Sequence, residues 1–190
     1  HAACFTSFSQ DHLDYHQTLE AYFDAKSRLF AELIDEKGYA VLNADIPEYE
    51  SLASLCQKRG VATLSYGKAG KNICLQSLTP HEDGQEIRLS VEGTSYHLTL
   101  PLVGEFQTYN VMAALGATIA CGGNVEKMVK GCHHLTGVTG RLERIAPGVY
   151  IDYAHTPDGL RVALQALRPH TKDKLWVVFG CGGNRDALKR

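Results

Sequence analysis

The stretch "DHLDYH" places two carboxylates and two imidazoles close together, at Asp11, His12, Asp14 and His16. Carboxylate oxygens and imidazole nitrogens are suitable ligands for a hard or borderline cation, so this stretch is a candidate metal site. Asp residues also shape polar turns, and the spacing D-x-x-x-H is not a specific metal signature. The spacing alone therefore leaves a metal site and a polar turn both open.

Lys26 follows within a segment, residues 19–34, whose apolar residues have the i, i+3, i+4 spacing of an amphipathic helix. By that spacing Lys26 shares the apolar face with Phe23 and Leu29. A lysine on such a face usually extends its amine to the edge of the core. The alternative is a buried lysine, and burial favours the neutral, reactive form of the amine.

Three further stretches could contact a ligand. "GKAGKN" (67–72) fails the phosphate-loop pattern G-x-x-x-x-G-K-[ST], so we expect a turn. "FGCGGNRD" could present backbone N–H groups to an anion after a strand, but it lacks the third glycine of G-x-G-x-x-G. "DYAHTPDGL" places Asp152 and His155 at the carboxyl end of a predicted strand, where open α/β sheets bind ligands. Thr156 and Pro157 are also ordinary residues for the start of a helix.

The elements that must position these residues alternate in type. Strands are predicted at residues 2–8, 39–43, 61–67, 149–154 and 174–180. Helices are predicted at residues 19–34, 47–60, 106–123, 124–135 and 157–169. Thr18 is a suitable N-cap for the first helix and Gly38 a suitable stop. Between about residues 72 and 102, alternating segments separated by turn residues predict an antiparallel meander, whereas the rest predicts a mostly parallel α/β sheet.

We place a domain boundary in the Gly- and Pro-bearing stretch 143–148, with residues 1–146 in one domain and residues 147–190 beginning a second. The chain starts close to a strand-like apolar segment and stops shortly after a glycine-rich turn. We therefore expect a fragment of a longer protein.

Composition argues against several classes of protein. The chain is 44% hydrophobic and 21% charged, with a formal net charge of -2, as in ordinary soluble proteins. This balance gives no electrostatic reason to expect nucleic acid or a membrane surface as a partner. No apolar run is long enough to span a bilayer, and no signal peptide is recognisable. The six cysteines form no C-x-x-C pair, so we expect free thiols in a reducing cytosol.

Several stretches together resemble the Mur ligase family of peptidoglycan synthesis. They are "DHLDYHQTLEAYFDAKSRLF", "GEFQTYNVMAALG", "GRLERI", "VYIDYAHTPDGLRVALQAL" and "KLWVVFGCGGNRDALKR". They occur in order over nearly the whole chain, and the resemblance is closest to the members that add the third residue of the stem peptide. It implies the second half of a central ATPase domain followed by the start of a Rossmann-like C-terminal domain. The family's phosphate loop would precede residue 1.

The resemblance also implies roles for single residues. Lys26 is similar to the lysine that these ligases carbamylate, and the carbamate would give oxygens to a magnesium ion that His12 helps to hold. Asp11, Asp14 and His16 would then shape the loop. Ser7, Gln17 and Gln107 depart from the Asn, Gly and Asn that are usual in the family.

The remaining roles concern ATP and the incoming amino acid. Asn110 would contact the adenine, Arg141 the ATP phosphates and Asp152 the ribose, with His155 beside the nucleotide. Arg185 would bind the carboxylate of the incoming amino acid through its bidentate guanidinium.

The activity that the resemblance implies is formation of an amide bond, with ATP and Mg²⁺ as cofactors. An amino acid, meso-diaminopimelate or L-lysine, would be joined to UDP-MurNAc-L-Ala-D-Glu through an acyl phosphate, by a monomer in the bacterial cytoplasm. We expect the 190-residue chain alone to be inactive. Two other functions stay open: the activity of another Mur ligase or of folylpolyglutamate synthase, and that of a non-catalytic nucleotide-binding module.

Overall fold

A six-stranded sheet forms the centre of the computed structural model, which describes residues 1–9 and 13–180, without the side chains of residues 13 and 14. In spatial order the strands are β1 (Ala2–Phe5), β2 (Tyr39–Asn43), β3 (Ala62–Gly67), β4 (Ile73–His81), β5 (Gly84–Val91) and β6 (Thr94–Leu100). Strands β1 to β4 pair in parallel, and β4, β5 and β6 pair antiparallel. The predicted mostly parallel sheet with an antiparallel meander is confirmed.

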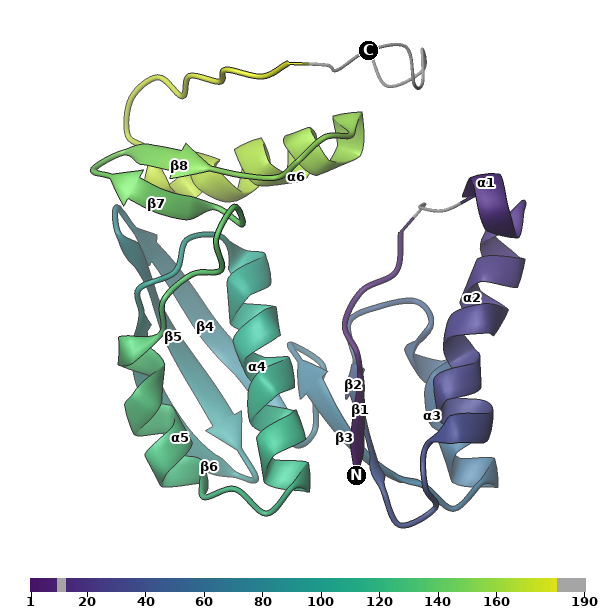
Figure 1. Cartoon of the computed structure of the whole chain (residues 1–190). Helices are drawn as coiled ribbons and strands as arrows, with labels where there is room; N and C mark the ends of the chain where they lie inside the picture. Colours follow the sequence, from purple (N-terminus) through teal and green to yellow (C-terminus); the bar gives the residue numbers. More distant parts are fainter. Residues whose placement is uncertain (10–12, 181–190) are drawn as a thin grey trace.

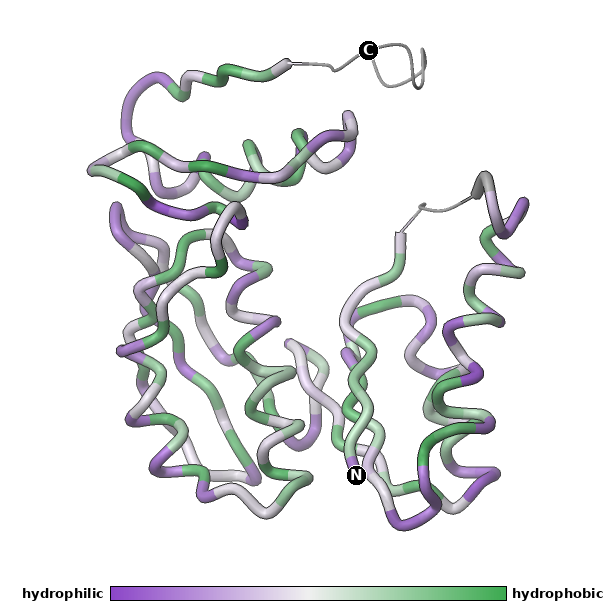
Figure 2. The backbone as a smooth tube through the Cα atoms, viewed as in Figure 1, coloured by the Kyte–Doolittle hydropathy of each residue, from purple (hydrophilic) through white to green (hydrophobic). Residues whose placement is uncertain are grey.

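Helices cover both faces of this sheet. The helices among the described residues are α1 (Leu13–His16), α2 (Leu19–Arg28), α3 (Tyr49–Lys58), α4 (Glu105–Ala120), α5 (Val125–Gly131) and α6 (Pro157–Leu167). Figure 1 shows α2 and α3 on one side of β1 to β3 and α4 on the other. Hydrophobic residues lie along β1, β2 and much of α4 (Figure 2), because β1 and β2 are covered by helices on both faces and α4 packs against the sheet.

Helix α4 packs unusually close to the sheet at Gly116. A Cβ atom at this position would lie 2.6 Å from Cγ1 of Val41 on β2, which is shorter than a van der Waals contact. The glycine therefore allows the close approach of helix and strand. This packing fixes the distance of α4 from the carboxyl ends of the parallel strands.

Helix α2 begins where the sequence predicts, and its continuation ends within one residue of the predicted end at Ile34. The Thr18 hydroxyl accepts a hydrogen bond from the Ala21 N–H at 3.1 Å, which confirms Thr18 as the N-cap. The helix continues as a π-helical turn, η1 (Leu29–Leu33), and its C-cap is Ile34 rather than Gly38. The short helix α1 precedes it, within a stretch that we expected to be a loop.

The face of α2 and η1 that packs on the sheet contains part of the predicted apolar stripe, but it does not include Lys26. Phe30 is fully buried and Ser27 nearly so, and Phe23 packs against the same cluster. Lys26 is exposed, and Leu29 beside it is 40% exposed. The option of a buried Lys26 is therefore wrong, because only the part of the stripe that contains Phe23 and Phe30 reaches the core.

Two strands form a separate hairpin after the main sheet. They are β7 (Glu143–Ala146) and β8 (Val149–Ile151), which pair antiparallel around Gly148 at φ +70°. Helix α6 and a 3₁₀ turn, η3 (Arg168–His170), follow. We call residues 140–170, which run from the turn 140–142 through β7, β8 and α6 to η3, the C-terminal unit. The boundary predicted between residues 146 and 147 falls at the turn of this hairpin and stays a prediction.

The strand predicted at residues 174–180 does not form. This segment has no regular secondary structure, and Trp176 and Val178 are 83% and 100% exposed. A strand needs a neighbour to pair with its backbone. The described sheets hold β1 to β6 and β7 with β8, and neither includes this segment.

Two other sequence expectations can be compared with the described residues. The five cysteines among them are free thiols, as predicted. Within the same residues no helix has the length and hydrophobicity that a membrane span requires.

Candidate functional site

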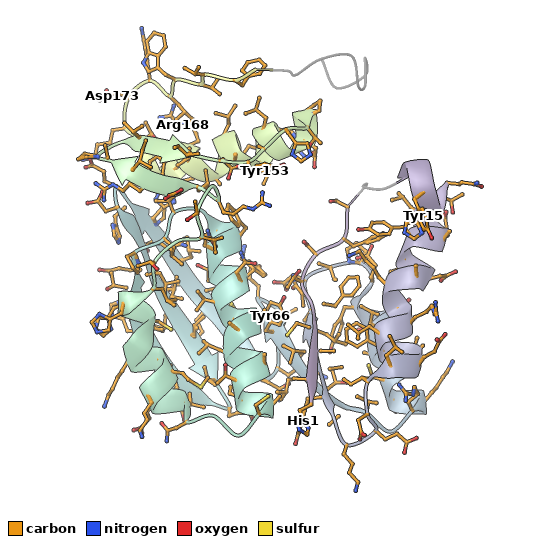
Figure 3. The ribbon with its side chains drawn as sticks, in the orientation of Figure 1. His1, Tyr15, Tyr66, Tyr153, Arg168 and Asp173 are labelled. Carbon is orange, nitrogen blue, oxygen red and sulfur yellow. The ribbon has the colours of Figure 1, made fainter. Side chains whose placement is uncertain are left out.

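The candidate site lies where the parallel strands β1, β2 and β3 end. Helix α4 begins at this edge of the sheet, and the C-terminal unit sits beside it (Figure 1). Figure 3 shows Tyr15, within the "DHLDYH" stretch, and Tyr153, next to Asp152, at the same end of the molecule. Open α/β sheets bind ligands at this edge.

A tight turn in "GRLE" presents Arg141. The Gly140 N–H donates to Oε2 of Glu143 at 2.8 Å, and the Leu142 N–H donates to Oδ2 of Asp152 at 2.9 Å. Leu142 has φ +46°, in the left-handed region that a leucine rarely adopts. The two carboxylates therefore hold a strained turn in place.

Asp152 also orders its own strand end. Its Oδ1 accepts from the Ala154 N–H at 2.8 Å, so each carboxylate oxygen of Asp152 accepts one backbone hydrogen bond. The Tyr153 N–H donates to the Gly140 carbonyl at 2.8 Å. These bonds join "GRLE" to "DYAH" and place the two motifs side by side.

Arg141, Asp152, Tyr153 and His155 form a group that we call the arginine cluster. The Arg141 guanidinium carbon lies 5.1 Å from the centre of the Tyr153 ring, which is a cation–π distance. The ring centres of Tyr153 and His155 are 5.2 Å apart, and Nδ1 of His155 lies 3.0 Å from the Tyr153 carbonyl oxygen. Arg141 is exposed, so its cation is available to an anionic ligand.

Asn110 lies on α4 beside a cavity of about 490 Å³. Its side-chain amide donates to Oε1 of Gln107 at 3.1 Å, which fixes the amide and leaves one N–H and the carbonyl oxygen for a ligand. The cavity is also lined by apolar side chains, including Met128, Leu135 and Val138. A planar ring with polar edges matches such a site.

The wall of this cavity continues into the turn that presents Arg141. The Val138 carbonyl, on the cavity wall, accepts from the Arg141 N–H at 2.9 Å. A ligand with a flat ring at one end and an anionic group at the other could therefore contact both features.

The start of α4 is held by a network around Asp45. Its carboxylate accepts from the Tyr109 hydroxyl at 2.7 Å and from the backbone N–H groups of Lys68 and Ala69 at 2.6 and 2.8 Å. Partial burial would raise the pKa of Asp45, but these hydrogen bonds outweigh it and hold the pKa below its usual value. Burial and the bond to Asp45 raise the pKa of the Tyr109 hydroxyl.

The same network decides how "GKAGKN" behaves. The N–H groups that a phosphate loop would offer to an anion are bound to Asp45 at Lys68 and Ala69. The Lys68 ammonium pairs with Glu105 at 2.7 Å. The prediction of a turn rather than a phosphate loop is confirmed.

The remaining predicted site residues are not brought into this cluster. The Lys26 ammonium lies 5.0 Å from the centre of the Tyr22 ring, on α2, on the other side of β1 from α4 (Figure 1). His12 and Arg185 lie outside the described residues. Among the residues that the structure describes, no group of three or more His, Cys, Asp or Glu side chains could hold a metal ion.

Sequence reasoning missed four residues that shape the site. Glu143 and Tyr153 lie within the motifs "GRLE" and "DYAH", so their proximity to Arg141 and Asp152 was a usable signal. Asp45 and Tyr109 are 64 residues apart and carry no local signal. Their contact depends on the packing of α4 against the sheet.

Comparison with known proteins identifies the family of the chain. The family model of the Mur ligase middle domain matches residues 1–118, and that of the Mur ligase glutamate ligase domain matches residues 140–190. UDP-N-acetylmuramoyl-L-alanyl-D-glutamate--2,6-diaminopimelate ligases of Zymomonas mobilis and Caulobacter vibrioides are each 47% identical to the whole chain. The chain spans 40% of the length of these curated relatives.

A solved structure supports the same relationship. It is described as a UDP-N-acetylmuramoyl-L-alanyl-D-glutamate--2,6-diaminopimelate ligase and is 34% identical, with a TM-score of 0.77. The match covers 100% of this chain and 40% of that one. Two family models in sequence order, whole-chain relatives and a shared fold lead to one conclusion: the chain belongs to the Mur ligase family.

Proposed function

We propose that the protein acts as an ATP-dependent ligase that joins 2,6-diaminopimelate to UDP-N-acetylmuramoyl-L-alanyl-D-glutamate through an amide bond. The observation that carries the proposal is the 47% identity, over the whole chain, to two relatives named for this reaction. The arginine cluster supports it, because it offers a fixed cation beside a cavity that suits a nucleotide base. L-lysine is the second candidate for the incoming amino acid.

The reaction would proceed in two steps. The D-glutamyl carboxylate attacks the γ-phosphorus of ATP, and the bond from this phosphorus to the β–γ bridging oxygen breaks. The products of this step are an acyl phosphate and ADP. The amine of the incoming amino acid then attacks the acyl carbon, loses a proton and displaces inorganic phosphate. Phosphoryl transfer of this kind depends on positioning and on neutralising charge.

The chain's own residues would hold the nucleotide. In this proposal the adenine occupies the cavity beside Asn110, whose free N–H and carbonyl oxygen match the edge of the ring. Arg141 reaches the phosphates from the turn at the cavity wall. Asp152 binds the ribose, since each of its oxygens keeps a second lone pair after accepting its backbone N–H.

The proposed function also includes a magnesium ion, which Lys26 and His12 would help to hold. A bound Mg²⁺ would neutralise charge on the transferring phosphoryl group. Lys26 is exposed, so the structure gives it no burial that would favour the neutral amine, the form that adds carbon dioxide. A carbamate formed there would supply the oxygen ligands that Mg²⁺ prefers. The described residues do not build a magnesium site by themselves, and His12, the proposed second ligand, lies outside them.

The proposal extends to the incoming amino acid and to domain motion. Arg185 would bind the carboxylate of the incoming amino acid. The protein would act as a monomer in the cytoplasm. A hinge near residues 144–148 would let the C-terminal domain close. The domain boundary between residues 146 and 147 belongs with this hinge, because it falls at the turn between β7 and β8.

The test is a product assay on the complete protein that contains this chain. It is incubated with ATP, Mg²⁺, the UDP-linked dipeptide and one amino acid at a time, and the tripeptide product is identified by mass spectrometry. We expect ADP release and product with diaminopimelate, and neither with L-lysine. Product with lysine alone would make lysine the substrate, and the absence of any product would refute the ligase.

The same assay distinguishes the two remaining functions. Glutamate addition to a reduced folate would identify a folylpolyglutamate synthase. Saturable ATP binding without turnover of any substrate would identify a non-catalytic nucleotide-binding module. The isolated 190-residue chain should hydrolyse no ATP, and turnover by it would contradict the expectation that this chain alone is inactive.

A further inference from the structure

His170 joins the C-terminal unit to the main sheet through both nitrogens of its ring. It ends η3 and is 9% exposed. Its Nε2 accepts from the Gly104 N–H at 2.9 Å, and its Nδ1 lies 2.7 Å from the His81 carbonyl oxygen. A carbonyl oxygen only accepts hydrogen bonds, so the neutral ring with its proton on Nδ1 satisfies both partners. These partners lie 66 and 89 residues away in the sequence.

Gly104 is the residue from which α4 starts. It has φ +91°, and its carbonyl accepts from Nε2 of the fully buried Gln85 and from the Gln107 N–H, each at 3.0 Å. A Cβ atom here would lie 2.9 Å from Cε1 of Phe106 and 3.0 Å from Cβ of Ala166 on α6. The N–H and the carbonyl of Gly104 are therefore both held by hydrogen bonds. The acceptor of the N–H is His170, which belongs to the C-terminal unit.

Two other polar contacts between the C-terminal unit and the main sheet, among the described residues, are at the surface. Arg144 pairs with Asp83 at 2.7 Å, with both side chains more than a third exposed, and the Tyr150 hydroxyl donates to the Glu82 carbonyl at 3.3 Å. Exposed ion pairs contribute little to stability. The apolar cluster of Val103, Leu142, Ala163 and Leu167 is buried but non-directional. The two hydrogen bonds of His170 are buried and directional, so they can fix an orientation.

The orientation that they fix is that of the two halves of the proposed nucleotide site. Asn110 lies on α4, whose first residue follows Gly104, and the arginine cluster lies in the C-terminal unit with His170. We propose that His170 is a positioning residue that, once the C-terminal domain has closed, keeps Asn110 and the arginine cluster in register for one nucleotide. This inference rests on the proposed function, since it assumes that both halves bind the same ligand.

The test compares His170→Ala and His170→Gln with His97→Ala. His97 is an exposed histidine on β6, so it controls for loss of an imidazole without loss of the buried bonds. The first readout is the affinity of the complete protein for ADP. The second is the distance distribution between nitroxides at Glu126 on α5 and Gln165 on α6, carried on unnatural amino acids because Cys4 and Cys121 are exposed.

For His170→Ala we expect a folded protein with a broader distance distribution and ADP affinity reduced by about tenfold or more, since small misplacements in a site are costly. His170→Gln keeps an acceptor and should lose less. His97→Ala should match the wild type. An unchanged distance distribution with unchanged ADP affinity in folded His170→Ala would overturn the inference.

Two further outcomes need their own criterion: a His170→Ala variant that does not fold, and a wild-type protein that does not bind ADP. If His170→Ala fails to fold, ¹⁵N NMR of the wild-type ring decides: a proton on Nδ1 and none on Nε2 supports the inference, and a proton on Nε2 overturns it. If the wild-type protein does not bind ADP, the proposed function fails, and the distance distribution alone then judges whether His170 orients the C-terminal unit.

Discussion

Replacing Asp152 should release the turn that presents Arg141. The carboxylate accepts the Leu142 and Ala154 N–H groups at 2.9 and 2.8 Å. A hydrogen bond to a charged group contributes about 1.5–3 kcal/mol, and the lower end applies because Asp152 is only half-buried. Asp152→Ala should therefore lower the free energy of unfolding by about 3 kcal/mol. Asp152→Asn, which keeps one acceptor, should lose about half of that.

The assay follows the two amides themselves. Hydrogen exchange measured by NMR should accelerate about tenfold at the Leu142 and Ala154 amides in Asp152→Ala, since about 1.4 kcal/mol corresponds to a factor of ten. Urea unfolding is best followed by circular dichroism, because Trp176 is 83% exposed and its fluorescence would change little.

The matched control is Asp158→Ala, in the first turn of α6. Its carboxylate pairs with Arg161 at the surface, so we expect a loss of no more than about 1 kcal/mol. The role of Asp152 is refuted if Asp152→Ala costs no more than Asp158→Ala, or if the Leu142 amide keeps its protection. Either result would mean that other contacts hold the turn.

Three other substitutions follow from the site. Asp45→Asn should remove stability that the wild type has above the unfolded pKa of about 4 and loses as the pH falls through the lower folded pKa, so the two unfolding curves should converge in acid. Gly104→Ala should cost about 2 kcal/mol in thermal or urea unfolding, because φ +91° is strained for alanine and Cβ would press on Phe106. Lys26→Arg keeps the charge but forms no carbamate, so turnover by the complete protein should fall at least about tenfold with no change in unfolding.

For each of these three substitutions, one result would contradict the prediction. A constant difference between wild type and Asp45→Asn from neutral to acid pH would show that Asp45 is not stabilised in its charged form. Gly104→Ala with wild-type stability would show that the start of α4 adapts. Full turnover by Lys26→Arg would remove Lys26 from the magnesium proposal, and Lys37→Arg, at an exposed lysine beyond the end of η1, is the control for the substitution itself.

Local patterns predicted most elements correctly where the physical cause is local. Thr156 caps α6 through the Gly159 N–H, and Pro157 follows at its first turn, as the pattern indicates. The meander was recognisable because alternating residues were interrupted by turn residues. The exposure of Lys26 was not, since Lys26 lies three residues from both Phe23, which packs on the core, and Leu29, which is 40% exposed.

The sequence by itself determined the family, the order of the elements and the motifs "GRLE" and "DYAH", because these depend on residue identity and near-neighbour spacing. Only the tertiary structure decided that Lys26 is exposed, that Asp152 supports the turn of Arg141, and that residues 174–180 form no strand. It also decided that His170 reaches Gly104 and His81. Such contacts join residues far apart in the chain, so they arise from packing, and no local pattern encodes them.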